Sequence, residues 1–171
     1  MFENTIDRLR EGNKMYLRDR VCAEMRRQTA SGQRPYAVIL TCADSRVIPE
    51  AIFDAGIGEL FVIRVAGNIP GRTQLASVEY AVHHLGVKTV VVLGHTNCGA
   101  VGAALAGEFE GLTGEITREI GDAIGNEHEP LAACKKNVEH GIKTVKEQVH
   151  GTFDAVGAVY DIETGEVEFL K

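Results

Sequence analysis

The chain has 171 residues, 44% hydrophobic and 25% charged, which is typical of a globular protein with one domain. Its net charge of -6, with no cluster of Lys and Arg, argues against nucleic acid as the main partner. No apolar run approaches the roughly 20 residues of a membrane-spanning helix. The first residues lack the basic and apolar regions of a secretion signal, so we expect a cytoplasmic protein with no membrane partner.

Two helices are predicted in the first 32 residues. Apolar side chains recur at steps of three and four over residues 2–19, and a second, more polar helix ends near Ser31-Gly32. We divide the single domain, residues 1–171, into an N-terminal helical arm over residues 1–32 and an α/β core over residues 33–171. The arm has the pattern to pack on its own core or on a neighbouring subunit.

Strands and helices alternate through the core. Strands are expected at 36–41, 60–66, 90–93 and 156–162, and helices at 47–50, 73–85, 100–106 and 131–149. Residues 107–130 have weak periodicity and are expected to be irregular or to form short helices. After a turn at 163–165, residues 167–170 return as a strand. The pattern predicts an α/β fold, with a mostly parallel four-stranded sheet flanked by helices and a C-terminal antiparallel edge strand.

Side chains with metal-binding chemistry follow two of these strands. Cys42 lies just after the first strand, and His95 and Cys98 follow the third. Because ligands bind beyond the carboxyl ends of parallel strands, these three side chains can converge there. Two thiolates and an imidazole suit Zn²⁺. The other cysteines, Cys22 and Cys134, show no C-x-x-C spacing and are expected to be buried helix residues.

The fourth zinc ligand decides what such a site does. Asp44 is the nearby candidate, but Arg46 can hold its carboxylate with two hydrogen bonds. If the pair forms, the metal keeps a water that it makes acidic, and Asp44 orients that water. If Asp44 instead binds the metal, the site is closed and inactive.

The motif Cys42-Ala-Asp44-Ser45-Arg46, followed by His95-Thr-Asn-Cys98-Gly99, resembles the β class of carbonic anhydrases. The resemblance continues through Phe61-Val-Ile-Arg64, Ala66-Gly67-Asn68, Ser77-Val-Glu-Tyr80 and Gly157-Ala-Val-Tyr160-Asp. It implies Zn²⁺ on Cys42, His95 and Cys98, with Asp44 and Arg46 as the catalytic dyad. The implied reaction is reversible hydration of CO₂ to bicarbonate and a proton by a zinc-bound hydroxide.

The resemblance also implies a homodimer or a larger homo-oligomer, with the site at the subunit interface. The residues implied to line the substrate pocket are Gln33, Phe61, Ala66, Tyr80 and Gly99. Ile39 stands where members inhibited through a second bicarbonate site carry tryptophan, which disfavours that inhibition and favours the open site.

Two alternatives remain open from the sequence. The same zinc site is also found in relatives that hydrolyse carbonyl sulfide or carbon disulfide, and the metal motifs do not separate these substrates. A non-catalytic zinc-binding assembly protein, with Asp44 fixed on the metal, is the alternative from another functional class.

Overall fold

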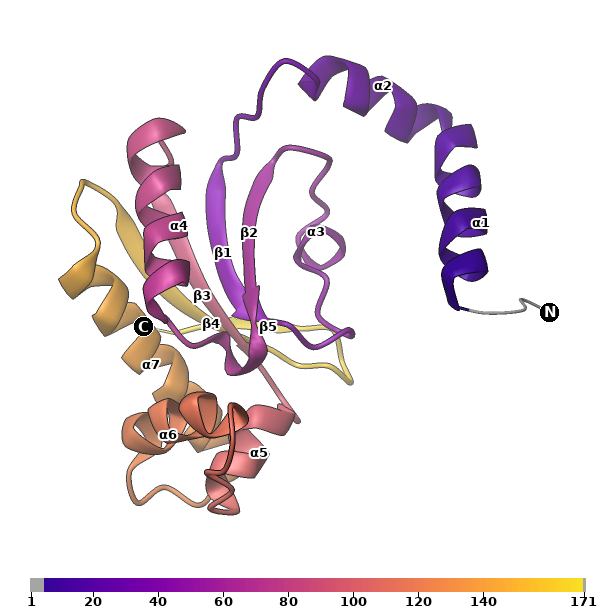
Figure 1. Ribbon diagram of the computed structural model, residues 1–171. Coiled ribbons are helices and arrows are strands. Elements are labelled where there is room, and N and C mark those ends of the chain that lie inside the picture. Colours follow the sequence, from indigo (N-terminus) through magenta and orange to yellow (C-terminus); the bar gives the residue numbers. More distant parts are fainter. Residues whose placement is uncertain (1–4, 171) are drawn as a thin grey trace.

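The computed structural model describes residues 5–170, and its centre is one five-stranded sheet (Figure 1). The strand order is β2-β1-β3-β4-β5. The first four strands pair in parallel and β5 pairs antiparallel with β4. The predicted fold class is therefore confirmed. The strands are β1 (Ala37–Cys42), β2 (Leu60–Val65), β3 (Thr89–His95), β4 (Asp154–Tyr160) and β5 (Val167–Phe169).

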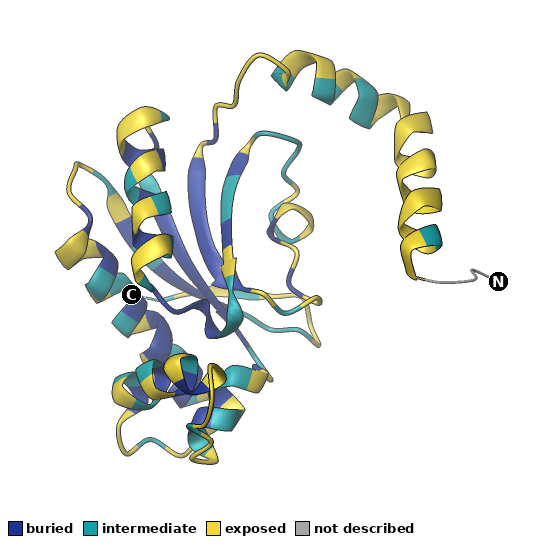
Figure 2. Cartoon of the chain, viewed as in Figure 1, coloured by how far each residue is buried: buried dark blue, intermediate teal, exposed yellow. Residues whose placement is uncertain are grey.

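The two faces of the sheet are covered differently. Helices α4 (Arg72–His84) and α7 (Pro130–Gln148) pack on one face, where Val38 and Leu40 of β1 enter the main core. On the other face, the alternate residue Ile39 packs beside the four-residue helix α3 (Pro49–Ile52). Both faces of β1 are buried, which explains its uninterrupted apolar sequence (Figure 2).

A third layer lies at the carboxyl end of the parallel strands. It consists of the 3₁₀ turn η1 (Ala66–Asn68), α5 (Gly99–Leu105) and α6 (Thr113–Ile124), which contact one another and α7. Their apolar side chains form a second core that includes Cys42 and Cys98. This layer therefore encloses the end of the sheet where the predicted metal ligands lie.

Helix α6 corrects the sequence analysis, which expected residues 107–130 to be irregular or to form short helices. The segment contains a regular helix of 12 residues whose buried face includes Thr117, Ile120 and Ile124. Ile116, Ile120 and Ile124 recur every four residues, but two glycines and two threonines, all weak helix formers, lower the helix propensity of the segment. Packing on α5 and α7 stabilises the helix despite these residues.

The N-terminal helices α1 (Thr5–Arg18) and α2 (Arg20–Thr29) are present as predicted; residues 2–4 of the first predicted helix lie outside the described residues. Asp19 caps α2 by accepting a hydrogen bond from the backbone N–H of Cys22 at 3.0 Å. Neither helix contains a buried residue, and both extend away from the sheet (Figures 1 and 2). Within residues 5–170, no helix is both long and apolar enough to cross a membrane.

Candidate metal centre

Three ligand atoms converge where β1 and β3 end. Cys42 is the last residue of β1, His95 the last of β3, and Cys98 immediately precedes α5. Their ligand atoms all lie within 4.8 Å of one another, and the Sγ atoms of Cys42 and Cys98 are 4.0 Å apart. Two thiolates on one tetrahedral zinc, each about 2.3 Å from it, lie about 3.8 Å apart. The spacing of the sulfurs therefore fits Zn²⁺.

The imidazole of His95 is oriented for a metal. Its Nδ1 lies 2.8 Å from the carbonyl oxygen of Thr96, which fixes the proton on Nδ1 and leaves the Nε2 lone pair free. Nε2 is buried and has no hydrogen-bond partner among the described residues. A buried polar atom without a partner is costly, so a cation at this nitrogen would relieve the cost.

The thiol of Cys42 is set up to ionise. A hydrogen bond from Cys98 is the main cause that lowers the pKa of Cys42, and the backbone N–H groups of Asp44 and Gly67 lower it further at 3.4 and 3.3 Å from Sγ. The same neighbouring sulfur, with burial, raises the pKa of Cys98. One proton is thus shared by two sulfurs, and a divalent cation would replace it.

Asp44 lies beside this group but is held by Arg46. Nε and Nη2 of Arg46 donate to Oδ1 and Oδ2 of Asp44 at 2.9 and 2.7 Å, and the backbone N–H of Arg46 donates to Oδ1 at 2.9 Å. These hydrogen bonds hold the pKa of the Asp44 carboxyl well below its usual range. Oδ2 is still 4.0 Å from His95 Nε2. The structure therefore has the Asp44–Arg46 pair, the first of the two arrangements considered from the sequence.

Two residues that the sequence analysis did not assign a role support this pair. Arg64 donates from Nη2 to the carbonyl oxygen of Asp44 at 2.6 Å and from Nε to that of Cys42 at 3.3 Å. Asn97, in the left-handed region at φ 55°, accepts a hydrogen bond from Arg46 Nη2 on its carbonyl oxygen at 3.2 Å. The guanidinium of Arg46 therefore links both ligand-bearing loops. An arginine inside the apolar strand β2 was the signal that could have identified Arg64.

A family model described as carbonic anhydrase matches residues 37–167, which include the three ligands and the Asp44–Arg46 pair. The chain belongs to the β-carbonic anhydrase family. Carbonic anhydrase 2 of Mycobacterium tuberculosis is 45% identical over 122 residues, which cover 68% of this chain and 59% of the relative. The chain thus matches less than two thirds of that relative's length.

Solved structures of the family agree with the fold. The β-carbonic anhydrase CcaA superposes with a TM-score of 0.82 at 26% identity, covering 98% of this chain and 96% of that one. A structure from a study of two tetrameric β-carbonic anhydrases of the ascomycete Sordaria macrospora has a TM-score of 0.77 at 28% identity, covering 98% of both chains. The resemblance recognised in the sequence is confirmed at the level of family and fold.

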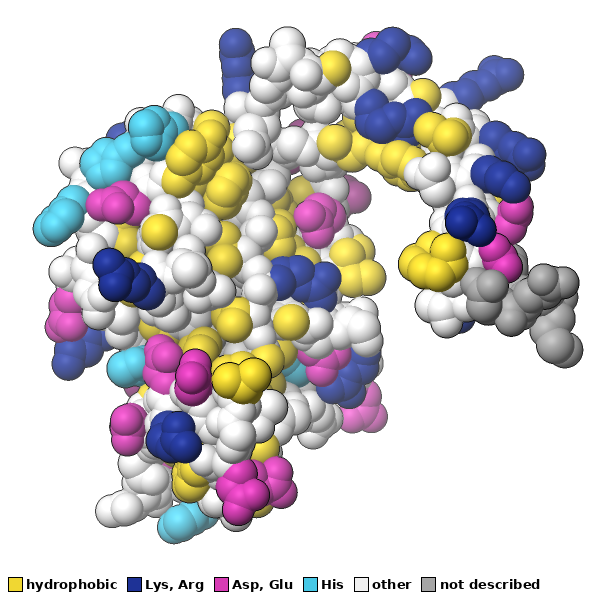
Figure 3. Space-filling model, viewed as in Figure 1, with side chains coloured by type: hydrophobic (Ala, Val, Ile, Leu, Met, Phe, Trp, Pro, Cys, Tyr) yellow, Lys and Arg dark blue, Asp and Glu magenta, His cyan; other side chains and the backbone are white. Residues whose placement is uncertain are grey.

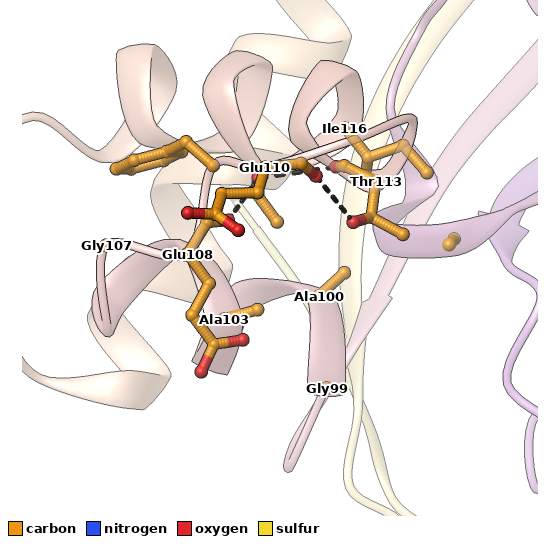
Figure 4. A pocket seen from close by; sticks show the side chains of 11 residues that line it. Gly99, Ala100, Ala103, Gly107, Glu108, Glu110, Thr113 and Ile116 are labelled. Atoms are coloured by element: carbon orange, nitrogen blue, oxygen red, sulfur yellow. Dashed lines mark hydrogen bonds between the residues drawn. The ribbon is translucent and has the colours of Figure 1, made fainter.

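The predicted substrate-pocket residues fall into two groups. Gly99 directly follows the proposed ligand Cys98, and Ala66 follows Val65, which pairs with Cys42 on β1. Both line a pocket of about 650 Å³ between α5 and α6. In Figure 4, Ala100 and Ala103 of α5 lie across this pocket from α6. This part of the predicted pocket adjoins the metal group within one chain.

The other three residues lie elsewhere. Phe61 and Tyr80 contact each other, with ring centroids 6.1 Å apart. Phe61 is in register with Val38, four residues before Cys42 on β1, or about 13 Å along the strand. Gln33 lines a different groove, beside Met25 and Gly58. A single chain therefore does not bring these three residues close to its own three proposed ligands.

The remaining cysteines and histidines do not add to the centre. Cys134 is buried as predicted and donates from Sγ to the carbonyl oxygen of His95 at 3.3 Å, whereas Cys22 is half-buried on α2. Within the described part of the chain, Cys42, His95 and Cys98 form the one cluster of His, Cys, Asp or Glu with metal-binding spacing.

Proposed function

We propose that this protein is a zinc enzyme that catalyses the reversible hydration of CO₂ to bicarbonate and a proton. The observation that carries the proposal is the buried group of two sulfurs and one unpartnered imidazole nitrogen beside an aspartate held by arginine. A bound Zn²⁺ lowers the pKa of water and so supplies a nucleophile at neutral pH. Family membership supports the same assignment.

Each side chain has one role in this proposal. Cys42, His95 and Cys98 hold the ion, and the two thiolates neutralise its charge. Asp44 stays ionised, so it can accept a hydrogen bond and orient the attacking oxygen toward CO₂. Arg46 keeps Asp44 in that position and away from the fourth coordination place.

The test is stopped-flow hydration of CO₂ by the zinc-loaded protein at pH 8 to 9, where the nucleophile is available. We expect a rate well above the buffer background, lost when Cys98 is replaced by Ser. A zinc-loaded, folded protein that shows no rate above background would overturn the proposal. In the same preparation, release of sulfide from carbonyl sulfide or carbon disulfide, without CO₂ hydration, would support the alternative hydrolase.

A non-catalytic zinc protein is the less favoured reading of the same residues. It requires Asp44 on the metal, but three hydrogen bonds from Arg46 hold this carboxylate. A four-coordinate site in crystals of the zinc protein grown above pH 8, with Asp44 as the fourth ligand, would support this reading.

We also propose that the N-terminal arm, residues 1–32, binds a second copy of the chain. The arm exposes Ile6, Leu9, Met15, Leu17 and Val21, and Figure 3 shows hydrophobic side chains along its concave side. Seven Lys and Arg against five Asp and Glu give the arm a net charge of +2, which leaves -8 on the rest of the chain. The arm and the core of another copy are therefore complementary in charge.

The core offers a matching surface. The sheet face that lacks a long helix carries an apolar groove of about 240 Å³, lined in part by Tyr36, Ile39 and Phe169. A partner there would cover it. Gln33, Phe61 and Tyr80, which lie away from the ligands of their own chain, would need the metal centre of another copy to line a substrate pocket. The tetrameric enzymes of Sordaria macrospora are a precedent for assembly in the family.

A cytoplasmic location is part of the same proposal. All four cysteines are free thiols, and the proposed zinc ligands must remain reduced to bind the metal. A reducing compartment satisfies this requirement.

A further inference from the structure

A buried asparagine on α7 stands out from the helix face around it. Asn137 is 1% exposed, and the neighbouring buried positions of the helix are apolar or small: Ala133, Cys134, Val138, Gly141 and Val145. An amide in such a place is costly unless it makes hydrogen bonds. Its partner therefore indicates why a polar residue stands at this position.

That partner, Gly67, contacts one of the proposed zinc ligands. Nδ2 of Asn137 donates to the carbonyl oxygen of Gly67 at 2.9 Å, and the backbone N–H of Gly67 donates to Cys42 Sγ at 3.3 Å. A carbonyl accepts and does not donate, so the contact also fixes which end of the amide faces Gly67. Two hydrogen bonds thus connect α7 to a proposed zinc ligand, although Asn137 lies 70 residues after Gly67 in the sequence.

Gly67 depends on contacts with other residues for its conformation, because a glycine has weak backbone preferences of its own. Its φ of +69° is in the left-handed region, and a Cβ there would lie 2.6 Å from Ile120 Cδ1 and 3.1 Å from Ala100 Cβ. The position therefore requires glycine, the residue with the widest choice of conformations. Contacts between Gly67 and its surroundings must therefore select one conformation. Asn137 supplies the contact at the carbonyl oxygen of Gly67.

We propose that Asn137 is a positioning residue of the metal centre, which holds Gly67 so that its N–H points at the Cys42 sulfur. This inference rests on the proposed binding of Zn²⁺ at Cys42, His95 and Cys98. The N–H group donates to the sulfur that would bind the metal, and a ligand that is oriented by such a partner holds its metal more tightly. Partners outside the ligand set that orient ligands in this way typically change metal affinity about 10- to 100-fold when removed.

The test compares two variants of Asn137 with a matched control on the same helix face. Asn137→Leu keeps the branched shape of the side chain, at a larger volume, but has no donor, and Asn137→Ser keeps a small polar side chain that is too short to reach Gly67. Val145→Ala is the control, because Val145 is fully buried in the main core, away from Gly67. Circular dichroism selects the variants that fold, and a chelator competition then measures Zn²⁺ affinity.

We expect both Asn137 variants to bind Zn²⁺ about 10- to 100-fold more weakly than the parent, and Val145→Ala to bind within about threefold of it. In the Co²⁺-loaded proteins, the sulfur-to-cobalt charge-transfer band should shift in the Asn137 variants and not in the control. A folded Asn137→Ser or Asn137→Leu protein with control-like affinity and an unshifted band would overturn the proposal. Neither readout uses CO₂, so a failure of the proposed activity would be seen separately.

Discussion

At the scale of single residues, Asp44 combines a position beside the metal group with a carboxylate that Arg46 keeps ionised. Asn at this position has the same shape, but it lacks the charge and presents one acceptor in place of two. We expect Asp44→Asn to lower kcat/KM for CO₂ hydration at least about 100-fold, the scale of a lost positioned proton acceptor. Zinc content, measured by atomic absorption, should stay at one ion per chain.

The control for this variant is Asp122→Asn, an exposed aspartate on α6. It removes the same charge from the chain at a distance from the ligands. Full activity in Asp44→Asn, or an equal loss in the control, would contradict the role assigned to Asp44.

The same pair predicts a pH dependence of stability. Arg46 lowers the pKa of Asp44 in the folded chain, so the pair stabilises the fold above the unfolded-state pKa of about 4. This stabilisation is lost as the pH falls through the lower folded value. In urea unfolding of the metal-free chain, the difference between the parent and Asp44→Asn should be constant from pH 5 to 8. It should shrink only below about pH 4. A difference that already shrinks between pH 6 and 8 would assign the effect to another group.

The sequence predicts some of these residues and not others, for a physical reason. Cys42, His95 and Cys98 could be predicted because strand ends in a parallel sheet meet at one edge. Arg64 and Asn137 act on backbone atoms of distant segments. No spacing in the sequence shows which carbonyl a side chain will meet, since that depends on the packed fold.

At the scale of elements, the strands follow from their apolar runs, whereas α6 combines an apolar repeat of three isoleucines with glycines and threonines that weaken its helix propensity. Its residue Ile120 is fully buried in the core that includes Cys42 and Cys98. The tight space around Gly67 is bounded by the same side chain. Helix α6 therefore packs against the candidate metal centre, although its glycines and threonines are residues common in connecting segments.

Truncating the buried side chain of Ile120 should destabilise the fold. We expect Ile120→Ala to lower the free energy of unfolding by about 2 to 5 kcal/mol, the range for a buried isoleucine or leucine cut to alanine. Leu112→Ala, next to the same helix and 85% exposed, should change it by less than about 0.5 kcal/mol. Urea unfolding followed by circular dichroism measures both. Equal effects in the two variants would mean that α6 does not pack on this core in solution.

At the scale of the whole molecule, α1 and α2 are the helices of the described chain that contain no buried residue. We expect the double variant Leu9→Asp with Val21→Asp to dissociate the assembly, because it places two charges in an apolar interface. Light scattering coupled to size-exclusion chromatography at micromolar concentration should give the mass of one chain, 18.5 kDa, for the variant and a multiple of it for the parent.

Leu112→Asp, a change of the same kind on the core surface, is the control and should keep the parent mass. A parent protein that is monomeric, or a variant that keeps the parent mass, would exclude the arm as the contact. The assembly is also the least predictable property from the sequence: an amphipathic arm does not specify which apolar surface it covers.

The order of the strands has a consequence for how the protein is made. Cys42 and Cys98 are 56 residues apart, and their sulfurs approach each other only because β1 and β3 lie side by side in parallel. Parallel pairing of distant segments is a slow step of folding. A growing chain that ends before β3 presents one thiol of the group and none of the other ligands. Binding of the proposed metal would therefore follow the pairing of β1 with β3, and metal content would report how many chains have made that pairing.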